Sequence, residues 1–494
     1  MIIGRKEEIN LLKGITKDDR SHFVAVYGRR RVGKTFLIRE SYDYKFTFQH
    51  AGLSNGGLKE QLFAFCSSLK DSGYTFKRKP ENWLEAFEGL KDVIRQSQDE
   101  KKIVFIDELS WMDTPKCDLM IALENFWNAF ASARKDVILI VCASATSWML
   151  SKVVHNKGGL YNRLTDQIKL QTFTLKECED YINANSLAFT RIQILQYYMI
   201  FGGVPFYWSF LKKGFSITQN IDNILFAKDA PLKKEFEYLY ASIFKNPEVY
   251  LKIIYALGTK KIGMTREEII ENTDIPNSGD LTVKLDELES CGFIRKYTAF
   301  GMKTKNSIFQ LIDNFTLFYY KFLQTYPTDE HYWANQINTP ALNNWLGLAF
   351  ERICLEHINQ IKMKLGISGV HTEVNSWYCM ANSEKGIFGS QIDLLIVRDD
   401  QVINLCEMKY SGTNYTIKQE DDEAIRNRIS DLINVTKTRC AVFPTLITTY
   451  GLADNGYASN IQSVVTLDDL FVVTIHHKKF TKNRHYPLFK EIQM

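Results

Sequence analysis

The chain has 494 residues, 45% of them hydrophobic and 24% charged, and this composition excludes a disordered protein or a fibre. The formal net charge of +4, from 61 basic and 57 acidic residues, is far from the basic excess of a protein that coats DNA. No apolar run is long enough to span a membrane, and the nine cysteines include no Cys-x-x-Cys pair. We therefore expect a cytoplasmic protein of roughly three domains, with reduced thiols and no membrane partner.

Residues 1–172 alternate short apolar runs with long amphipathic stretches. The apolar runs are Phe23–Tyr27, Ile103–Ile106 and Val137–Val141. Short buried strands separated by helices are typical of a parallel sheet covered by helices. This part of the chain is predicted to be an α/β domain.

A complete phosphate-binding loop follows the first apolar run. It reads Gly28-Arg29-Arg30-Arg31-Val32-Gly33-Lys34-Thr35, and Phe36 continues into a helical stretch. Its glycines let backbone N–H groups turn toward phosphates, Lys34 reaches the β- and γ-phosphates, and Thr35 holds Mg²⁺. We predict that these residues bind ATP, with Mg²⁺ as the second cofactor.

The second apolar run ends in two carboxylates, as in a Walker B segment. Asp107 is expected to bind Mg²⁺, and Glu108 lies where such ATPases keep a base that polarises the attacking water. Two acids can also simply cap a strand. The complete phosphate-binding loop favours the hydrolytic interpretation, so we predict an ATP hydrolase.

These motifs resemble the AAA-like branch of P-loop ATPases, and specifically the STAND-type ATPases of archaea and anaerobic bacteria that begin with Gly-Arg-x-x-Glu. Here that motif is Gly4-Arg5-Lys6-Glu7-Glu8. The resemblance implies that Gly4 and Arg5 lie against the adenine and that Ser144 is a polar sensor at the end of its strand. It also implies that Pro205, in Gly-Val-Pro, belongs to a turn of a helical lid. A serine or a Gly-Val-Pro sequence is also ordinary turn chemistry.

Arg163 matches the position where related ATPases place an arginine finger, a cation that stabilises charge on the transferring phosphoryl group. A neighbouring subunit of a homo-oligomer can supply such a finger, or it can act within its own chain. The third interpretation is that Arg163 forms a surface salt bridge. The sequence leaves these three open.

Residues 173–323 show mainly helical spacing of apolar residues. We assign 173–240 to a helical lid and 241–323 to a winged helix. The winged helix is predicted from three helices and a β-ribbon: Pro247–Leu257, Thr265–Asn272, Leu281–Cys291, and the strand pair Phe293–Tyr297 and Ser307–Ile312.

The third helix of this segment, Gly279–Gly292, carries four acidic residues against the single cation Lys284, so it would repel phosphates. This favours a lid or an interdomain module over a reader of DNA sequence. Non-specific DNA contact is the alternative. The lysines that would make it are Lys260, Lys261, Lys303 and Lys305.

Residues 324–344 contain two prolines and few aliphatic residues, which indicates a linker. The last domain, 345–494, begins with a predicted helix Trp345–Lys364. Two strands, Gln391–Val397 and Val402–Lys409, are then expected to form a hairpin.

The hairpin carries Asp393, Glu407 and Lys409, and Glu351 in the preceding helix adds a third carboxylate. Two carboxylates can hold Mg²⁺ while a lysine positions or deprotonates water. Asp393 and Glu407 share a face only if the loop is three residues long, 399–401, or a bulge restores the offset. The alternative is that these charged side chains form a cross-strand salt bridge with a structural role only.

This pattern of Asp, spacer and Glu-x-Lys resembles the PD-(D/E)xK nuclease superfamily. Residues 345–471 look like the C-terminal domain that follows the ATPase in the same archaeal and bacterial family. The resemblance implies that Asp393 and Glu407 bind a metal and that Glu351 and Lys409 complete the site.

The sequence as a whole predicts an α/β protein: a P-loop NTPase parallel sheet with helical lid and winged helix, followed by a PD-(D/E)xK nuclease-like α/β domain. Its expected function is that of a Mg-dependent ATPase whose nucleotide state controls a C-terminal domain acting on nucleic acid. The alternative is an ATP-driven conformational switch whose last domain holds DNA or a protein without cutting. A purely structural role is disfavoured, because the hydrolytic set is complete.

Overall fold

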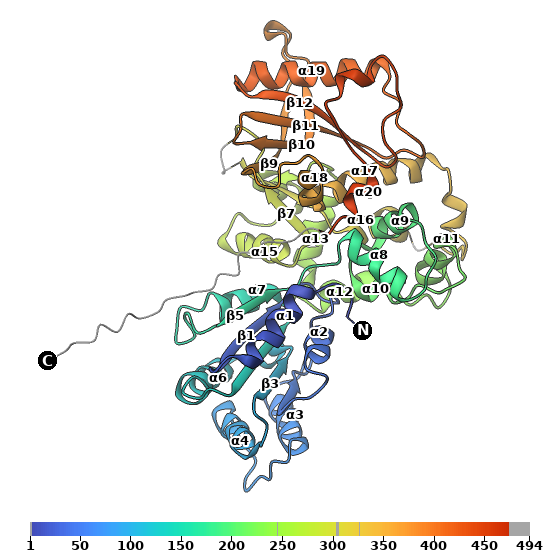
Figure 1. The fold of residues 1–494 in the computed structure, drawn as a ribbon. Helices are drawn as coiled ribbons and strands as arrows, with labels where there is room; N and C mark the ends of the chain where they lie inside the picture. The colour runs from blue at the N-terminus through green and yellow to red at the C-terminus, as the bar shows by residue number, and fades with distance from the viewer. Residues whose placement is uncertain (1, 245, 303–305, 326, 474–494) are drawn as a thin grey trace, which may run out of the picture. The chain divides into compact units, whose positions relative to one another are not determined.

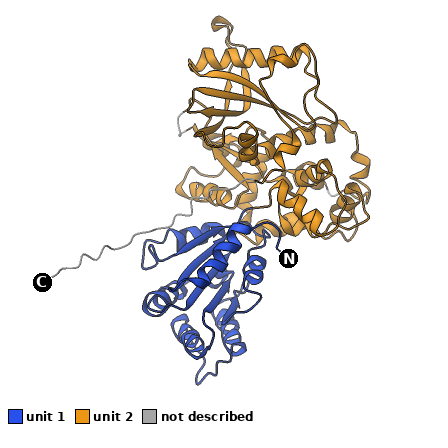
Figure 2. Cartoon of the chain, viewed as in Figure 1, with its two compact units in different colours: residues 1–171, 476–494 blue, residues 172–475 orange. Residues whose placement is uncertain are grey.

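The computed structural model describes residues 2–473 except 245, 303–305 and 326. The chain divides into two compact units, the first ending at Gln171 and the second beginning at Thr172 (Figure 2). Lys303, Lys305 and the last 21 residues of the predicted C-terminal domain, 474–494, lie outside the described residues.

Unit 1 is built on a five-stranded parallel sheet with the order β2-β3-β4-β1-β5. Figure 1 labels strands β1, β3 and β5 of this sheet. Its strands are β1 His22–Tyr27, β2 Phe48–Ala51, β3 Lys102–Asp107, β4 Val137–Ala143 and β5 Asp166–Lys169. The three strands predicted from apolar runs are confirmed. Because parallel neighbours need crossover connections, a helix follows most strands.

Helices cover both faces of this sheet, so the side chains of one strand alternate between two cores. Phe23 and Ala25 of β1 pack in the core formed with α3, α4 and α6, whereas Val24 packs in the core formed with α1 and α2. The helices of unit 1 are α1 Lys6–Gly14, α2 Lys34–Ser41, α3 Leu58–Asp71, α4 Trp83–Gln96, α5 Leu109–Met112, α6 Leu119–Asn125 and α7 Thr146–Met149.

Unit 2 begins with helices, as predicted. They are α8 Leu175–Ala184, α9 Arg191–Phe201, α10 Pro205–Trp208, α11 Ile217–Ile221 and α12 Glu235–Ala241. Thr174 starts α8 with a capping box, in which its hydroxyl and Glu177 satisfy each other's backbone N–H groups. Across the described residues, no helix is both long and apolar enough to cross a membrane.

The next part of unit 2, here called the three-helix segment, covers residues 247–311. Its helices are α13 Pro247–Gly258, α14 Arg266–Thr273 and α15 Gly279–Ser290, and its strands are β6 Met264–Thr265, β7 Ile294–Tyr297 and β8 Ile308–Leu311. The strands form an antiparallel sheet of order β6-β8-β7. The three predicted helices and the predicted strand pair are therefore confirmed.

A second five-stranded sheet, of order β13-β12-β11-β10-β9, forms the last part of unit 2. Its strands are β9 Thr372–Cys379, β10 Ser390–Arg398, β11 Val402–Lys409, β12 Ala441–Thr448 and β13 Ser463–Val465. Strands β9, β10 and β11 pair antiparallel, and β12 and β13 add in parallel. Two further helices of this part are α19 Gln419–Thr436 and α20 Leu467–Leu470.

The register of the β10–β11 hairpin is the one predicted. Leu394 pairs with Cys406 and Val397 with Ile403, and the strands are joined by three residues, 399–401. Gln401 adopts φ 65°, the left-handed conformation that ends three-residue hairpin loops. In the same register Asp393 and Glu407 are opposite each other on the two strands, so their side chains lie on the same face of the sheet.

One helix boundary differs from the prediction. The helix expected over Trp345–Lys364 begins earlier, as α17 Pro340–Glu356, and breaks before α18 Ile358–Lys364. Thr339 caps the new start with its hydroxyl and Pro340 takes the first helical position, so the end of the predicted linker is helical. The break falls at buried His357, whose Nε2 accepts the backbone N–H of Leu175.

Gly203 is predicted to be sensitive to the smallest enlargement. A Cβ added there would lie 1.8 Å from the backbone oxygen of Phe173, which cannot move because Phe173 N–H donates to Gly203 O at 2.6 Å. We expect Gly203→Ala to lower the free energy of unfolding by about 1–3 kcal/mol in chemical denaturation. The control is Gly279→Ala, where a Cβ meets nothing within 4 Å, and equal losses in both variants would contradict the prediction.

Candidate functional site

The strand order of unit 1 decides where its polar residues meet. Strand β4 lies between β1 and β3, and all three are parallel, so their carboxyl ends reach the same edge of the sheet. The phosphate-binding loop follows β1, Asp107 and Glu108 end β3, and Ser144 follows β4. Ligands of open parallel sheets bind at this edge.

Two glycines give the phosphate-binding loop its backbone shape. Gly28 has φ 145°, and a Cβ there would lie 2.3 Å from the oxygen of Leu170, so the loop can pass Leu170 only as glycine. Gly33 has φ 90° and precedes the first turn of α2, whose free N–H groups favour an anion.

Lys34 is buried, and its ammonium is held by the loop itself. Its Nζ donates to the oxygens of Gly28 at 2.9 Å and Arg29 at 3.1 Å, and to Ser144 Oγ at 3.1 Å. These acceptors hold the cation at the mouth of the loop, where phosphate oxygens can replace them.

Glu108 is fixed by the residue at the end of the neighbouring strand. Ser144 donates its backbone N–H to Glu108 Oε2 at 3.0 Å and its hydroxyl to Oε1 at 2.5 Å. Glu108 itself has φ 47°, a left-handed conformation that turns the chain from β3 into α5. Lys34, Ser144 and Glu108 thus form one hydrogen-bonded network.

Thr35 and Asp107 are the pair that fits a magnesium ion. The hydroxyl of Thr35 donates to Asp107 Oδ2 at 2.6 Å, and Asp107 Oδ1 accepts the backbone N–H of Glu108 at 2.9 Å. Hydroxyl and carboxylate oxygens are the ligands that Mg²⁺ takes in nucleotide sites. The fold therefore brings together Thr35 and Asp107, the two residues predicted from the sequence to bind this Mg²⁺.

Four further residues predicted to bind the nucleotide are Gly4, Arg5, Arg31 and Phe36. Arg5 has φ 57°, is buried, and donates from Nη2 to the oxygen of Gln171 at 2.6 Å, which ties the start of unit 1 to its end. Gly4 precedes it with φ 62°. Arg31 also has a left-handed backbone, at φ 70°, and Phe36 is 46% exposed.

Two predicted residues are not joined to the network. Arg163 is exposed, in a turn where its backbone N–H donates to Leu160 O, and within the described part of the chain its side chain makes no hydrogen bond or ion pair. Pro205 is the first residue of α10 and belongs to unit 2.

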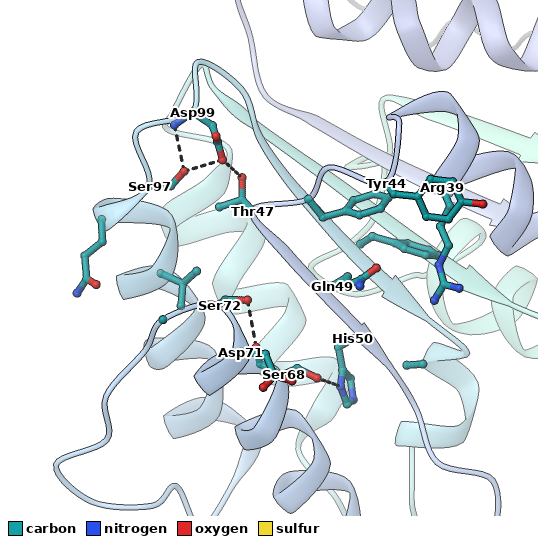
Figure 3. Close-up of a pocket in the computed structure, with 16 residues that line it drawn as sticks. Arg39, Tyr44, Thr47, Gln49, His50, Ser68, Asp71, Ser72, Ser97 and Asp99 are labelled. Atoms are coloured by element: carbon teal, nitrogen blue, oxygen red, sulfur yellow. Dashed lines mark hydrogen bonds between the residues drawn. The ribbon is translucent and has the colours of Figure 1, made fainter.

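A polar pocket of about 780 Å³ also lies in unit 1, beside β2 (Figure 3). Thr47 and Ser97 both donate to Asp99, and His50 Nδ1 lies 2.9 Å from Ser68 Oγ. Burial lowers the pKa of His50 to about 4, so it is neutral at pH 7. None of the phosphate-binding residues lines this pocket, so it is distinct from the nucleotide site.

The acidic residues predicted in the C-terminal domain do gather, around a pocket of about 310 Å³. A lysine that the sequence suggested only as a possible DNA contact joins two of them. Lys261, from the three-helix segment, lies 2.7 Å from Glu351 Oε2 and 3.2 Å from Asp393 Oδ2. Burial lowers the pKa of Lys261, but Asp393 and Glu351 outweigh this and raise it overall, so the ammonium stays charged at neutral pH.

Glu407 forms ion pairs with two other cations. Lys409 lies 2.9 Å from Glu407 Oε1, and Arg428 of α19 lies 2.8 Å from Oε2. Burial raises the pKa of Glu351 in the same pocket, although Lys261 opposes this. Among the described residues no group of three or more His, Cys, Asp or Glu side chains is arranged to hold a metal ion. The carboxylates are instead matched by three cations.

Neither Lys261 nor Arg428 could have been found from a local pattern. Lys261 lies far along the chain from Glu351 and Asp393, in a turn before β6. Arg428 is one of several charged residues on an amphipathic helix, where charges are usually solvated.

The fold and the network at the sheet edge define a P-loop ATPase. Residues 2–207 match a family described as an ATPase domain predominantly from Archaea. Residues 315–425 match a second family, described as archaeal and bacterial proteins of unknown function.

Two relatives match the chain over different lengths. The chain is 24% identical over 408 residues to "Uncharacterized protein MJECL04" of Methanocaldococcus jannaschii, which covers 81% of this chain and 85% of that protein. A segment of 45 residues is 40% identical to "Uncharacterized ATP-binding protein MJ0423" of the same organism, covering 9% of this chain and 76% of that protein.

Solved structures resemble the chain more distantly. The Walker-type ATPase PABY2304 of Pyrococcus abyssi is 15% identical, with a TM-score of 0.45, and covers 64% of this chain and 95% of its own. The ORC2 protein of Aeropyrum pernix, solved as ADPNP and ADP complexes, is 13% identical, with a TM-score of 0.40, and covers 72% of this chain and 95% of its own.

Lys34 and Glu108 are predicted to separate ATP binding from hydrolysis. Lys34→Ala should lose ATP binding, because it removes the cation that contacts the phosphates. Glu108→Gln should still bind ATP but turn it over at least about a hundredfold more slowly, because the base that polarises water is lost. Binding is measured by calorimetry with a non-hydrolysable analogue, and hydrolysis by phosphate release.

The matched control is Glu100→Gln, an exposed acid shortly before β3. It should leave both quantities unchanged. Wild-type turnover in Glu108→Gln would refute the assignment of the base.

Proposed function

We propose that the protein is a Mg-dependent ATP hydrolase whose nucleotide state controls its C-terminal domain, and that this domain acts on nucleic acid. The observation that supports ATP hydrolysis most directly is a hydrogen-bonded network of Lys34, Ser144 and Glu108, with the pair Thr35 and Asp107 beside it. Every residue type needed to hold a triphosphate, a hard cation and an attacking water occurs at one sheet edge.

Each residue has a separate task in this proposal. Lys34 binds the terminal phosphates, and Thr35 and Asp107 hold Mg²⁺, which neutralises developing charge when it is bound. Glu108 accepts hydrogen bonds from Ser144 on both carboxylate oxygens. At least one of these hydrogen bonds must break before Glu108 can orient a water. Ser144 then becomes free to contact phosphate, the role of a polar sensor.

The exposed Arg163 suits a finger supplied to a neighbouring copy. We propose this trans role over a surface salt bridge, because Arg163 pairs with no carboxylate among the described residues. From the family resemblance we also propose that Gly4 and Arg5 lie beside the adenine and that Pro205 belongs to the lid.

Arg163→Ala is predicted to slow hydrolysis at least about tenfold while leaving ATP affinity unchanged, because the finger acts only on the transition state. The rate per subunit should rise with protein concentration in the wild type. Lys157→Ala, at an exposed lysine in the same turn region, is the control. A monomer whose rate is independent of concentration would exclude a trans finger.

For the C-terminal domain, we propose a nuclease-like site formed by Glu351, Asp393, Glu407 and Lys409. The carboxylates line one pocket, and Lys409 shares a strand face with Glu407. A divalent cation held by Asp393 and Glu407 would polarise a phosphodiester, and Lys409 would position the water. To bind there, the cation has to displace the ammonium of Lys261.

The pairing of these acids with three cations also favours a second candidate. Lys261, Lys409 and Arg428 already neutralise the carboxylates, as in a structural ion-pair cluster. In that case the domain binds nucleic acid or protein without cutting, and the ATPase serves as a conformational switch.

The three-helix segment is proposed to be a winged helix that acts as a lid or interdomain module. Lys284, the single cation of α15, is already bound to Asp280 at 2.6 Å, which leaves that helix with little attraction for phosphates. Its contact with DNA would therefore be weak and non-specific.

Nuclease activity is predicted to need Mg²⁺ or Mn²⁺ and to fall at least about a hundredfold in Lys409→Ala, measured by cleavage of labelled single- and double-stranded DNA and RNA with ATP present. Lys385→Ala, at an exposed lysine of the same domain, should cut like the wild type. Lys261→Gln should cut faster at limiting metal, because the competing ammonium is gone. If wild type and Lys261→Gln are both inert, the non-cutting candidate stands.

A further inference from the structure

A second cavity in unit 2, of about 300 Å³, shares Lys261, Glu351 and Asp393 with the acidic pocket, but the rest of its wall has no task in the function proposed above. It opens where the three-helix segment meets α17. Its wall includes five lysine and arginine side chains and two carboxylates, Glu351 and Asp393, which are both bound by Lys261. The remaining cations give the cavity an excess of positive charge.

Two hydrogen-bond donors in this wall are buried without an acceptor. Trp345 is 5% exposed and its Nε1 has no partner, and Arg352 Nη2 is likewise buried and unpartnered. The Arg352 guanidinium lies 4.9 Å from the centre of the Trp345 ring, and its Nε makes only a long bond of 3.5 Å to Asn314 Oδ1. Leaving such donors unsatisfied is unfavourable, and more so for a charged group.

Arg295 of β7 is a second guanidinium in the same wall. Its Nε donates to Gln310 Oε1 at 2.7 Å, and it lies 4.7 Å from the centre of the Tyr297 ring. Neither Arg295 nor Arg352 forms an ion pair with a described carboxylate. Burial lowers the pKa of both, that of Arg352 to about 10, which reflects the cost of keeping these charges out of water.

The rest of the lining is mainly apolar, with Leu257, Leu317 and Leu348 among its side chains. A volume of about 300 Å³ lies at the lower end of small-molecule pockets and is too small for a nucleic-acid duplex. A ligand here would therefore have one anionic end and a compact organic body.

We propose that this cavity binds a small organic phosphate of roughly mononucleotide size, whose phosphate is held by Arg352, Arg295 and the indole N–H of Trp345. Guanidinium groups match phosphate oxygens in pairs, and the indole supplies the neutral donor beside them. The ligand supplies the acceptors that these buried donors lack. This site goes beyond the proposed ATPase and nuclease and depends on neither.

The test is calorimetric titration of the full chain with AMP, and separately with inorganic phosphate, while the phosphate-binding loop is kept saturated with Mg²⁺ and a non-hydrolysable ATP analogue. AMP should bind at one additional site, and inorganic phosphate should compete with it more weakly. Arg352→Met should weaken AMP at least about tenfold, and Trp345→Phe, which removes one donor, at least about threefold. Arg439→Gln, at an exposed arginine outside this wall, should bind AMP like the wild type.

Thermal unfolding without ligand provides a second readout that a structural role would not give. Arg352→Met should not lower the melting temperature, because it replaces a buried unpaired charge by an apolar side chain. The proposal is overturned if neither probe binds, if both variants bind AMP like the wild type, or if Arg352→Met unfolds or loses stability. Tighter binding of a 5′-phosphorylated hexanucleotide than of AMP would also overturn it, in favour of a strand-end site.

Discussion

The position of one strand governs the chemistry at the nucleotide end of this protein. Because β4 is inserted between β1 and β3 in a parallel sheet, Ser144 stands between Lys34 and Glu108 and bonds to both. A lysine and a glutamate that belong to separate motifs are thereby coupled through one hydroxyl and one backbone N–H. Phosphate oxygens that displace this network would change the surroundings of the cation and the base in a single event, which is how nucleotide binding can be sensed within the sheet.

In the acidic pocket of unit 2, charge pairing joins residues from distant segments of the chain. Lys261 spans Glu351 and Asp393 from a different segment of the chain, and the same three residues line both cavities of this region. An ion pair of this kind is strong only while both partners are shielded from water. Any movement of the three-helix segment would therefore alter the charge offered by the acidic pocket.

Much of this could be predicted from the sequence, because the signals were local. The apolar runs around Phe23, Ile103 and Val137 predicted their strands, and the condition that Asp393 and Glu407 share a face predicted the three-residue loop of the hairpin. The start of α17 at Pro340 differs from the prediction, because proline indicates a linker in the sequence but also fits the first turn of a helix.

What could not be predicted depends on contacts between distant segments. The pairing of Ser144 with Glu108 needs the strand order, which no single motif contains. Lys261 and the unpartnered donors of Trp345 and Arg352 become visible only when two parts of unit 2 are packed together. A lone lysine in a turn or a tryptophan on an apolar helix face has an ordinary structural reading in the sequence.

We propose that the nucleotide held by unit 1 sets the state of the β10–β11 hairpin in unit 2. Hydrogen–deuterium exchange of the full-length Glu108→Gln protein, saturated in turn with ATP and with ADP, tests it without requiring any cleavage activity. The account predicts protection of the phosphate-binding loop with both nucleotides, and a different exchange rate in β10–β11 between them. Equal exchange in the hairpin, with the loop protected in both states, would contradict it.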